Sequence, residues 1–190
     1  MRDENKFQSG DEIKGGGPRL FLGAAASPFS SPVEMRPFRL AKKVAAGADF
    51  IQTQMIFDMD LFKRYMKKVV ELGLHEKVSI LAGLGPLKST PMARFLQNEV
   101  PGIEVPVHLL ERMDAAVKGI DKEDKDARRD AWRAEGIKLC IEQIQEVREI
   151  EGVAGVHIMA IEWEAAIKPI VEGAGLFPRP TIDSNSAFPE

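Results

Sequence analysis

The chain has 190 residues, of which 44% are hydrophobic, and its formal net charge is -3. This length and composition are those of a globular domain with one core, and they exclude disorder as the default state. A net negative charge offers no clustered basic surface for phosphates, so no nucleic-acid partner is expected.

The sequence carries no signal for export or for insertion into a membrane. No run approaches the roughly 20 apolar residues of a membrane helix, and the segment from Met1 to Gly10 is polar. Cys140 is the only cysteine, so no internal disulfide can form and a reducing cytoplasmic location is expected. Because Cys140 falls within a helical apolar pattern, we expect a buried core residue rather than a nucleophile.

After a charged, glycine-rich start, apolar strand-like runs alternate with amphipathic helical patterns. This alternation is typical of βα units that build a parallel sheet, and it predicts an α/β fold. The four predicted strands cover residues 20–27, 49–57, 78–84 and 153–161.

Helices are predicted between these strands wherever apolar residues recur at spacings of three and four. Asp58 is a good N-cap, and Gly47 and Gly73 are suited to the left-handed conformation that ends a helix. The charged run 121–130 is expected to be a solvated loop or a helix start. The predicted helices cover 33–46, 58–73, 92–97, 107–117 and about 137–150, and a last one, kinked or delayed by Pro169, ends near 173–175.

These elements divide the chain into three parts. Residues 1–19 are predicted to be a connector, 20–177 the folded domain and 178–190 a flexible tail. No spacing of cysteine and histidine predicts a metal site.

In a parallel βα array, ligands bind at the carboxyl ends of the strands. Gln52 and Gln54 lie on the same face of the second predicted strand, because strand side chains alternate. A buried amide needs a hydrogen-bond partner. Two interpretations stay open: the glutamines contact a polar ligand, or they satisfy each other or a buried water.

Other polar groups near the strand ends also allow two interpretations. His157 is expected more often to be a core residue than an acid/base catalyst. Arg36, Arg39 and Lys43 share one side of the first helix, where they could hold a phosphate or form a solvated basic face.

Several blocks of the sequence, in order, resemble the second half of the methylenetetrahydrofolate reductases. The most specific block runs from Lys42 to Gln54 and reads KKVAAGADFIQTQ. The others are GAAASPF at 23–29, PLKS at 86–89, GVAGVHIMA at 152–160 and GLFPRP at 175–180.

The resemblance, which covers roughly residues 1–182, implies a partial (β/α)8 TIM barrel made of strands five to eight with their helices. It implies FAD as the cofactor and reduction of 5,10-methylenetetrahydrofolate to 5-methyltetrahydrofolate in one-carbon metabolism. By the same resemblance, Gln54 would hydrogen-bond the pterin and Leu96 would pack on the folate or nicotinamide. Lys43, Lys42, Arg39, Ser27, Ala25 and Met159 would contact the flavin.

The resemblance also implies what this chain lacks. In the family, the first four strands supply the acid that protonates the folate, and no catalytic residue is therefore expected here. Met92 stands where some members have a substrate-binding glutamine. We expect the chain to be inactive without an N-terminal half, present in the same or another chain. The expected partners are that half or a homo-oligomer, with NAD(P)H or a redox protein as the electron donor. The alternatives are a non-catalytic accessory half barrel that binds folate or flavin, and a truncated gene product.

Overall fold

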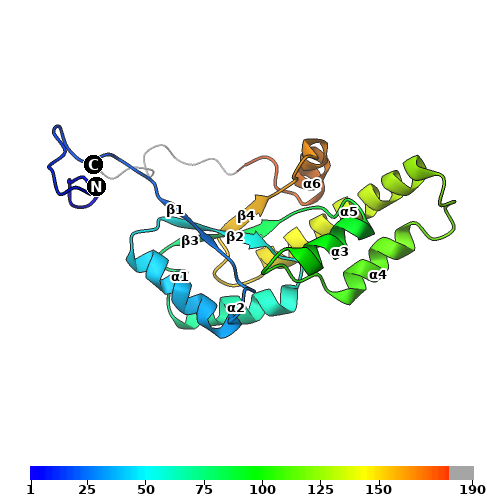
Figure 1. The fold of residues 1–190 in the computed structure, drawn as a ribbon, viewed down its shortest axis with the longest axis horizontal. Coiled ribbons are helices and arrows are strands. Elements are labelled where there is room, and N and C mark those ends of the chain that lie inside the picture. The colour runs from blue at the N-terminus through cyan, green and yellow to red at the C-terminus, as the bar shows by residue number, and fades with distance from the viewer. Residues whose placement is uncertain (180–190) are drawn as a thin grey trace.

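A computed structural model describes residues 1–179, and it contains one four-stranded parallel sheet (Figure 1). Its strands are hydrogen-bonded in chain order, β1-β2-β3-β4, as a series of βα units requires. The predicted α/β class is therefore confirmed. The strands are β1 (Gly23–Ala26), β2 (Phe50–Met55), β3 (Ser79–Leu84) and β4 (Gly155–Ile158).

Within residues 1–179, six α-helices and two 3₁₀ turns lie between the strands or follow the last one. In Figure 1, α1 and α2 lie below the sheet, and α3, α4 and α5 lie to its right. The helices are α1 (Arg36–Ala45), α2 (Met59–Glu71), α3 (Thr90–Glu99), α4 (Val107–Ala116), α5 (Lys125–Arg148) and α6 (Ile167–Gly173), and the 3₁₀ turns are Val33–Met35 and Glu164–Ala166.

The two outer strands are shorter than the sequence pattern predicts. The first and fourth predicted strands, 20–27 and 153–161, were too long at both ends, because β1 pairs only with β2 and β4 only with β3. An outer strand can form backbone hydrogen bonds only along the part of its single neighbouring strand that lies beside it. Of the predicted tail, residues 180–190 lie outside the described part of the chain.

Side chains cap three of the helices. Asp58 accepts a hydrogen bond from the Leu61 N–H at 2.8 Å, which confirms the predicted cap of α2. Ser89 caps α3, which therefore runs longer than the predicted 92–97. Asp124 accepts from the Ala127 N–H at 3.0 Å, so the charged run 121–130 is largely the first turn of α5 rather than a loop.

The helix-covered face of the sheet forms the main core. Ile51 and Ile80 are fully buried there against apolar side chains of α2 and α5, such as Phe62 and Ile144. Burial of side chains of this size stabilises the fold by roughly 2 kcal/mol each. A second cluster, which includes Leu87 and Met113, joins the end of β3 to α4 and α5.

The opposite face of the sheet is only partly covered within residues 1–179. Phe50, Gln52 and Gln54 are half-buried, whereas their alternating neighbours on β2 are buried. Across the sheet, this face carries a layer in register: Ala25 beside Gln52, Gln52 beside Leu81, and Leu81 beside Gly155. Parallel sheets are normally covered on both faces. We call this partly covered side the inner face.

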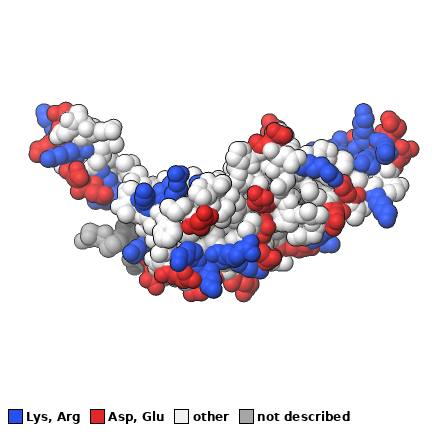
Figure 2. All heavy atoms as spheres, turned by 60° about the horizontal axis from the view of Figure 1, so that its bottom comes forward, with Lys and Arg blue, Asp and Glu red and all other residues white. Residues whose placement is uncertain are grey.

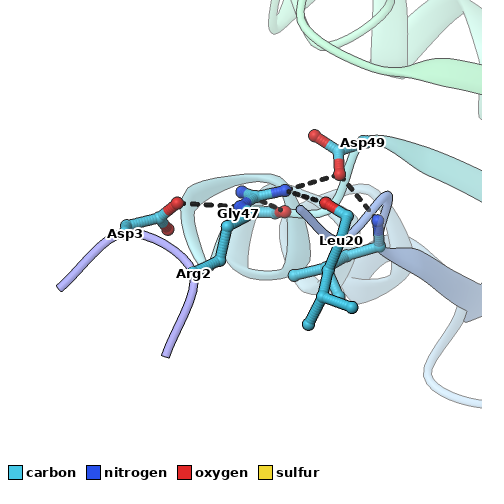
Figure 3. Close-up of polar contacts among 6 residues, drawn as sticks. Arg2, Asp3, Leu20, Gly47 and Asp49 are labelled. Carbon is cyan, nitrogen blue, oxygen red and sulfur yellow. Dashed lines mark hydrogen bonds and ion pairs between the residues drawn. The ribbon is translucent and has the colours of Figure 1, made fainter. Parts of the chain in front are cut away.

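The first residues of the chain are fastened to the start of β2. The Arg2 guanidinium pairs with Asp49 at 2.6 Å and donates to the Gly47 carbonyl oxygen, and Asp49 also accepts from the Leu22 N–H (Figure 3). Residues 1–19 otherwise contain one isolated bridge, between Lys6 and Glu12.

Charges of both signs are interspersed over the side of the molecule shown in Figure 2. Between α4 and α5, Arg112 contacts Glu135 and Glu142, each at 2.6 Å. The Arg112 guanidinium lowers the pKa of Glu142 by hydrogen bonding to its carboxylate. Ion pairs of this partly exposed kind join neighbouring helices but stabilise them by less than about 1 kcal/mol.

Cys140 lies in the main core on α5 and is 1% exposed, as the apolar pattern predicts. Burial raises the pKa of its thiol to about 12. Because the thiolate is the reactive form, we expect the folded chain to be inert to a disulfide reagent such as DTNB at mildly alkaline pH. One thiol per chain should react after unfolding in urea, and stoichiometric labelling of the folded protein would contradict this prediction.

Candidate functional site

A cavity of about 410 Å³ opens at the carboxyl ends of β1, β2 and β4, where the inner face meets α1. This is the end of a parallel sheet where ligands bind, and the volume falls within the range of small-molecule sites. Its walls combine strand residues with one side of α1. They are formed by Ala25, Ala26, Ser27, Arg36, Arg39, Leu40, Lys43, Gln52, Thr53, Gln54, Tyr65, His157 and Met159.

Gln54 projects from the inner face at a register shift between Gln52 and Met55. Its side-chain oxygen accepts a hydrogen bond from the Met55 N–H at 3.1 Å. Within residues 1–179 no hydrogen bond joins it to Gln52, so the structure does not support the interpretation that the two glutamines satisfy each other. The Gln54 amide nitrogen is left to donate into the cavity.

Thr53 fixes this irregular part of β2, a role that the sequence pattern did not reveal. Its buried hydroxyl donates to the Gln54 carbonyl oxygen at 2.9 Å and accepts from the Gly83 N–H at 2.8 Å. Gly83 allows the approach, because a Cβ there would lie 2.3 Å from the Thr53 carbonyl oxygen. A glycine in a strand beside a threonine is the available signal for such a bulge.

The cations of α1 that reach the cavity have two roles. Lys43 lines the cavity and donates to the Ala25 carbonyl oxygen, and Arg39 lines the cavity beside it. Arg36 also reaches the wall, but its guanidinium donates to the carbonyl oxygens of Ser30 and Ser31, each at 2.5 Å, and so holds the loop after β1.

Lys42 is not among the residues that line the cavity. Successive helix residues are rotated by about 100°, so the side chain next to Lys43 points elsewhere. Leu96 also lies off this cavity, in the second core cluster, where it is 8% exposed. The cavity therefore does not support the predicted contacts of Lys42 with flavin and of Leu96 with folate or nicotinamide, which stay predictions.

Ser27, Ala25 and Met159 do lie on the cavity wall. The Ser27 hydroxyl hydrogen-bonds that of Ser30 at 2.6 Å, which holds it at the end of β1. Met159 follows β4 and is anchored by its N–H, which donates to the Leu84 carbonyl oxygen at 2.7 Å. The structure thus gathers most of the predicted site residues around one cavity.

Tyr65 and His157 line the same cavity and were not predicted as site residues. Tyr65 falls in the apolar stripe of α2, and burial raises the pKa of its hydroxyl. Its helical spacing is that of a core residue, so the sequence offered no signal for a cavity contact.

The described residues contain no helix long and apolar enough to cross a bilayer and no group of histidine, cysteine and carboxylate side chains able to hold a metal ion. Nor does any carboxylate line the cavity in this part of the chain. The site therefore offers cations, amides, an imidazole and hydroxyls, a set suited to an anionic ligand with hydrogen-bond acceptors.

The fold and the site define a parallel α/β protein with a ligand cavity at its strand ends. The sequence model of methylenetetrahydrofolate reductase matches residues 25–175. The chain belongs to the methylenetetrahydrofolate reductase family.

Known proteins show the same similarity. Methylenetetrahydrofolate reductase 2 of Saccharomyces cerevisiae is 30% identical over 85% of this chain and 26% of its own length. Methylenetetrahydrofolate reductase 1 of Schizosaccharomyces pombe is 28% identical over 77% of this chain and 23% of its own length. The chain thus spans about a quarter of the length of these relatives.

A solved structure shares the fold, with a TM-score of 0.55 and 16% sequence identity. It is an uncharacterized protein from Clostridium thermocellum that binds two copies of 5-methyl-5,6,7,8-tetrahydrofolic acid. The match covers 84% of this chain and 54% of that protein.

Proposed function

We propose that this chain is the C-terminal half of a flavin-dependent methylenetetrahydrofolate reductase barrel and that it works with an N-terminal half. In this proposal it contributes to reducing 5,10-methylenetetrahydrofolate to 5-methyltetrahydrofolate. The observation that carries the proposal is that Gln54 and Lys43, from the block most specific to the family, lie on the wall of one cavity at the strand ends.

The architecture supports a half barrel. The four strands follow one another in order, and their inner face is only partly covered within residues 1–179. β1 and β4 are the outer strands of this sheet and leave backbone groups for further strands. Four more βα units would make the eight strands of a closed barrel. The assignment of these strands as five to eight rests on the family resemblance.

The cavity residues fit a flavin dinucleotide and a folate. Arg39 and Lys43 place two cations beside the strand ends, where they would hold phosphate or carboxylate groups. The Gln54 amide would orient the pterin ring. When bound, FAD supplies the hydride that the folate receives.

The proton needed at the folate nitrogen has no carboxylic acid as its source in the described part of the cavity. No carboxylate lines it, and Gln54 cannot act as a general acid. In this proposal the N-terminal half brings the acid, and the chain alone is inactive. NAD(P)H or a redox protein supplies the electrons, and the cytoplasm is the proposed location.

Reconstitution tests this proposal. The chain is mixed with the first four βα units of a family barrel, supplied as a second polypeptide, and FAD binding is followed by flavin fluorescence. We expect FAD to bind the pair and 5-methyltetrahydrofolate to form when a reductant is added. A pair that assembles but neither binds FAD nor forms the product overturns the proposal.

A second candidate function is a non-catalytic accessory half barrel that binds folate or flavin. The absence of a carboxylate from the described cavity wall favours it. Folate binding by the chain that persists when no partner restores reduction would identify this function.

A further inference from the structure

His157 lies on the inner face of the sheet and shares the cavity with Gln54 and Lys43. It is paired in register with Gly83 on β3, which presents no side chain toward it. The groups that share the cavity wall with the imidazole come from β1, β2, α1 and α2, together with Ser27 and Met159. Apart from the cations of α1 and the tyrosine of α2, these neighbours have no ionisable side chain.

The two ring nitrogens of His157 differ in their surroundings. Nδ1 is buried and has no hydrogen-bond partner. Nε2 is not among the buried unpaired atoms, and no hydrogen bond to it is found within residues 1–179. Because the residue lines the cavity, Nε2 is the nitrogen exposed there.

This difference selects a tautomer of the neutral ring. One nitrogen carries the proton and donates, and the other accepts. A buried N–H without an acceptor is rarer in proteins than a buried acceptor without a donor. The proton is therefore expected on Nε2, which makes the ring a hydrogen-bond donor toward the cavity.

We infer that His157 is a ligand-contacting residue whose Nε2–H donates to a carbonyl oxygen or ring nitrogen of a fused heteroaromatic ring. The inference rests on the proposed function, in which flavin and pterin are the rings of this kind. His157 and the Gln54 amide then approach the ligand from two strands of one sheet, β4 and β2. Two donors on separate strands fix the orientation of a planar ring better than one.

The chain holds two internal controls. His75 also has a buried, unpaired Nδ1, but it lies before β3 beside Gly152 and not on the cavity. His108 is an exposed residue of α4. Only His157 should respond to a ligand in the cavity.

Nitrogen-15 NMR of the full chain reports the tautomer of each histidine directly. We expect His157 to hold its proton on Nε2 before any ligand is added. On titration with FAD or with 5-methyltetrahydrofolate, the His157 signal should shift while the signals of His75 and His108 stay in place. A proton on Nδ1, or a His157 signal unmoved by a ligand that binds, overturns the inference.

Substitutions add a second measurement in the reconstituted pair. His157→Phe keeps a planar ring without the donor, and His157→Gln places an amide N–H near the position of Nε2. We expect His157→Phe to weaken binding of the contacted ring about tenfold and His157→Gln to retain most of the affinity. Separate titrations with FAD and 5-methyltetrahydrofolate tell which ring is contacted.

The outcomes separate this inference from the proposed function. Equal affinity of His157→Phe and the unsubstituted pair for both ligands overturns the inference and leaves the proposed function intact. Failure of the unsubstituted pair to bind either ligand overturns both. Melting temperatures of the variants show whether a loss of binding reflects unfolding.

Discussion

Replacing Gly136 by alanine is expected to lower the free energy of unfolding by about 3 kcal/mol, and the melting temperature by roughly 10 °C. Gly136 lies in α5 where this helix crosses the loop after β3. A Cβ there would lie 1.8 Å from the Leu87 carbonyl oxygen and 2.9 Å from the Leu87 carbonyl carbon. The obstacle is backbone, which cannot turn aside as a side chain does, so α5 or the loop must shift.

The expected loss of stability is larger than the gain in helix propensity that alanine brings. Alanine favours a helix over glycine by about 1 kcal/mol, which would stabilise the variant if space allowed. Leu87 is 1% exposed in the second core cluster, so moving its backbone disturbs packed side chains. Equilibrium unfolding in urea, followed by circular dichroism, measures the difference.

Gly173→Ala is the matched control. Gly173 also lies in a helix, and a Cβ there would lie 2.5 Å from Ile141 Cδ1, the far end of a flexible side chain. We expect a change within about 1 kcal/mol, since the isoleucine can adopt another rotamer. Equal stability of Gly136→Ala and the unsubstituted chain would show that the contact with Leu87 is not as close as described.

The second large effect is expected on ligand binding in the reconstituted pair. Lys43→Met should weaken FAD binding by roughly 10- to 100-fold, because it removes a cation beside the proposed phosphate position. Gln54→Leu should weaken 5-methyltetrahydrofolate binding about tenfold and change FAD binding by less than about twofold. Fluorescence titration with each ligand separates the two roles.

The Lys42→Met variant separates the prediction made from the cavity geometry from the one made from the family resemblance. The resemblance places both lysines at the flavin, whereas only Lys43 lines the cavity. The geometry predicts that Lys42→Met binds FAD within about twofold of the unsubstituted pair, since a solvated charge is screened. Equal losses for the two lysines would contradict the geometric assignment, and no loss for Lys43 would contradict the proposed phosphate contact.

Much of the fold could be predicted because its signals are local. Strand alternation placed β2 and the glutamines of its inner face, and spacings of three and four placed the buried side of α2. Asp58 marked the start of α2 through the hydrogen bond that its own side chain makes. The strand ends were less well predicted, because a strand's length depends on its neighbour.

The candidate site was predicted in part. Arg39 and Lys43 share a helix side by spacing alone, and the convergence of Lys43 with Gln54 followed from the family blocks. The interpretation of His157 as a core residue missed its place on the cavity wall. Histidine on a strand face looks the same in a sequence whether its ring meets other side chains or an open cavity.

By itself, the amino-acid sequence determined the order of strands and helices, the apolar faces that pack and the family to which the chain belongs. Only the tertiary structure decided which of two adjacent lysines reaches the cavity, which nitrogen of His157 is exposed and why position 136 must be glycine. The first group depends on periodicity along a short segment. The second depends on contacts between segments distant in the chain, such as Thr53 with Gly83 and Leu87 with Gly136, which no local pattern specifies.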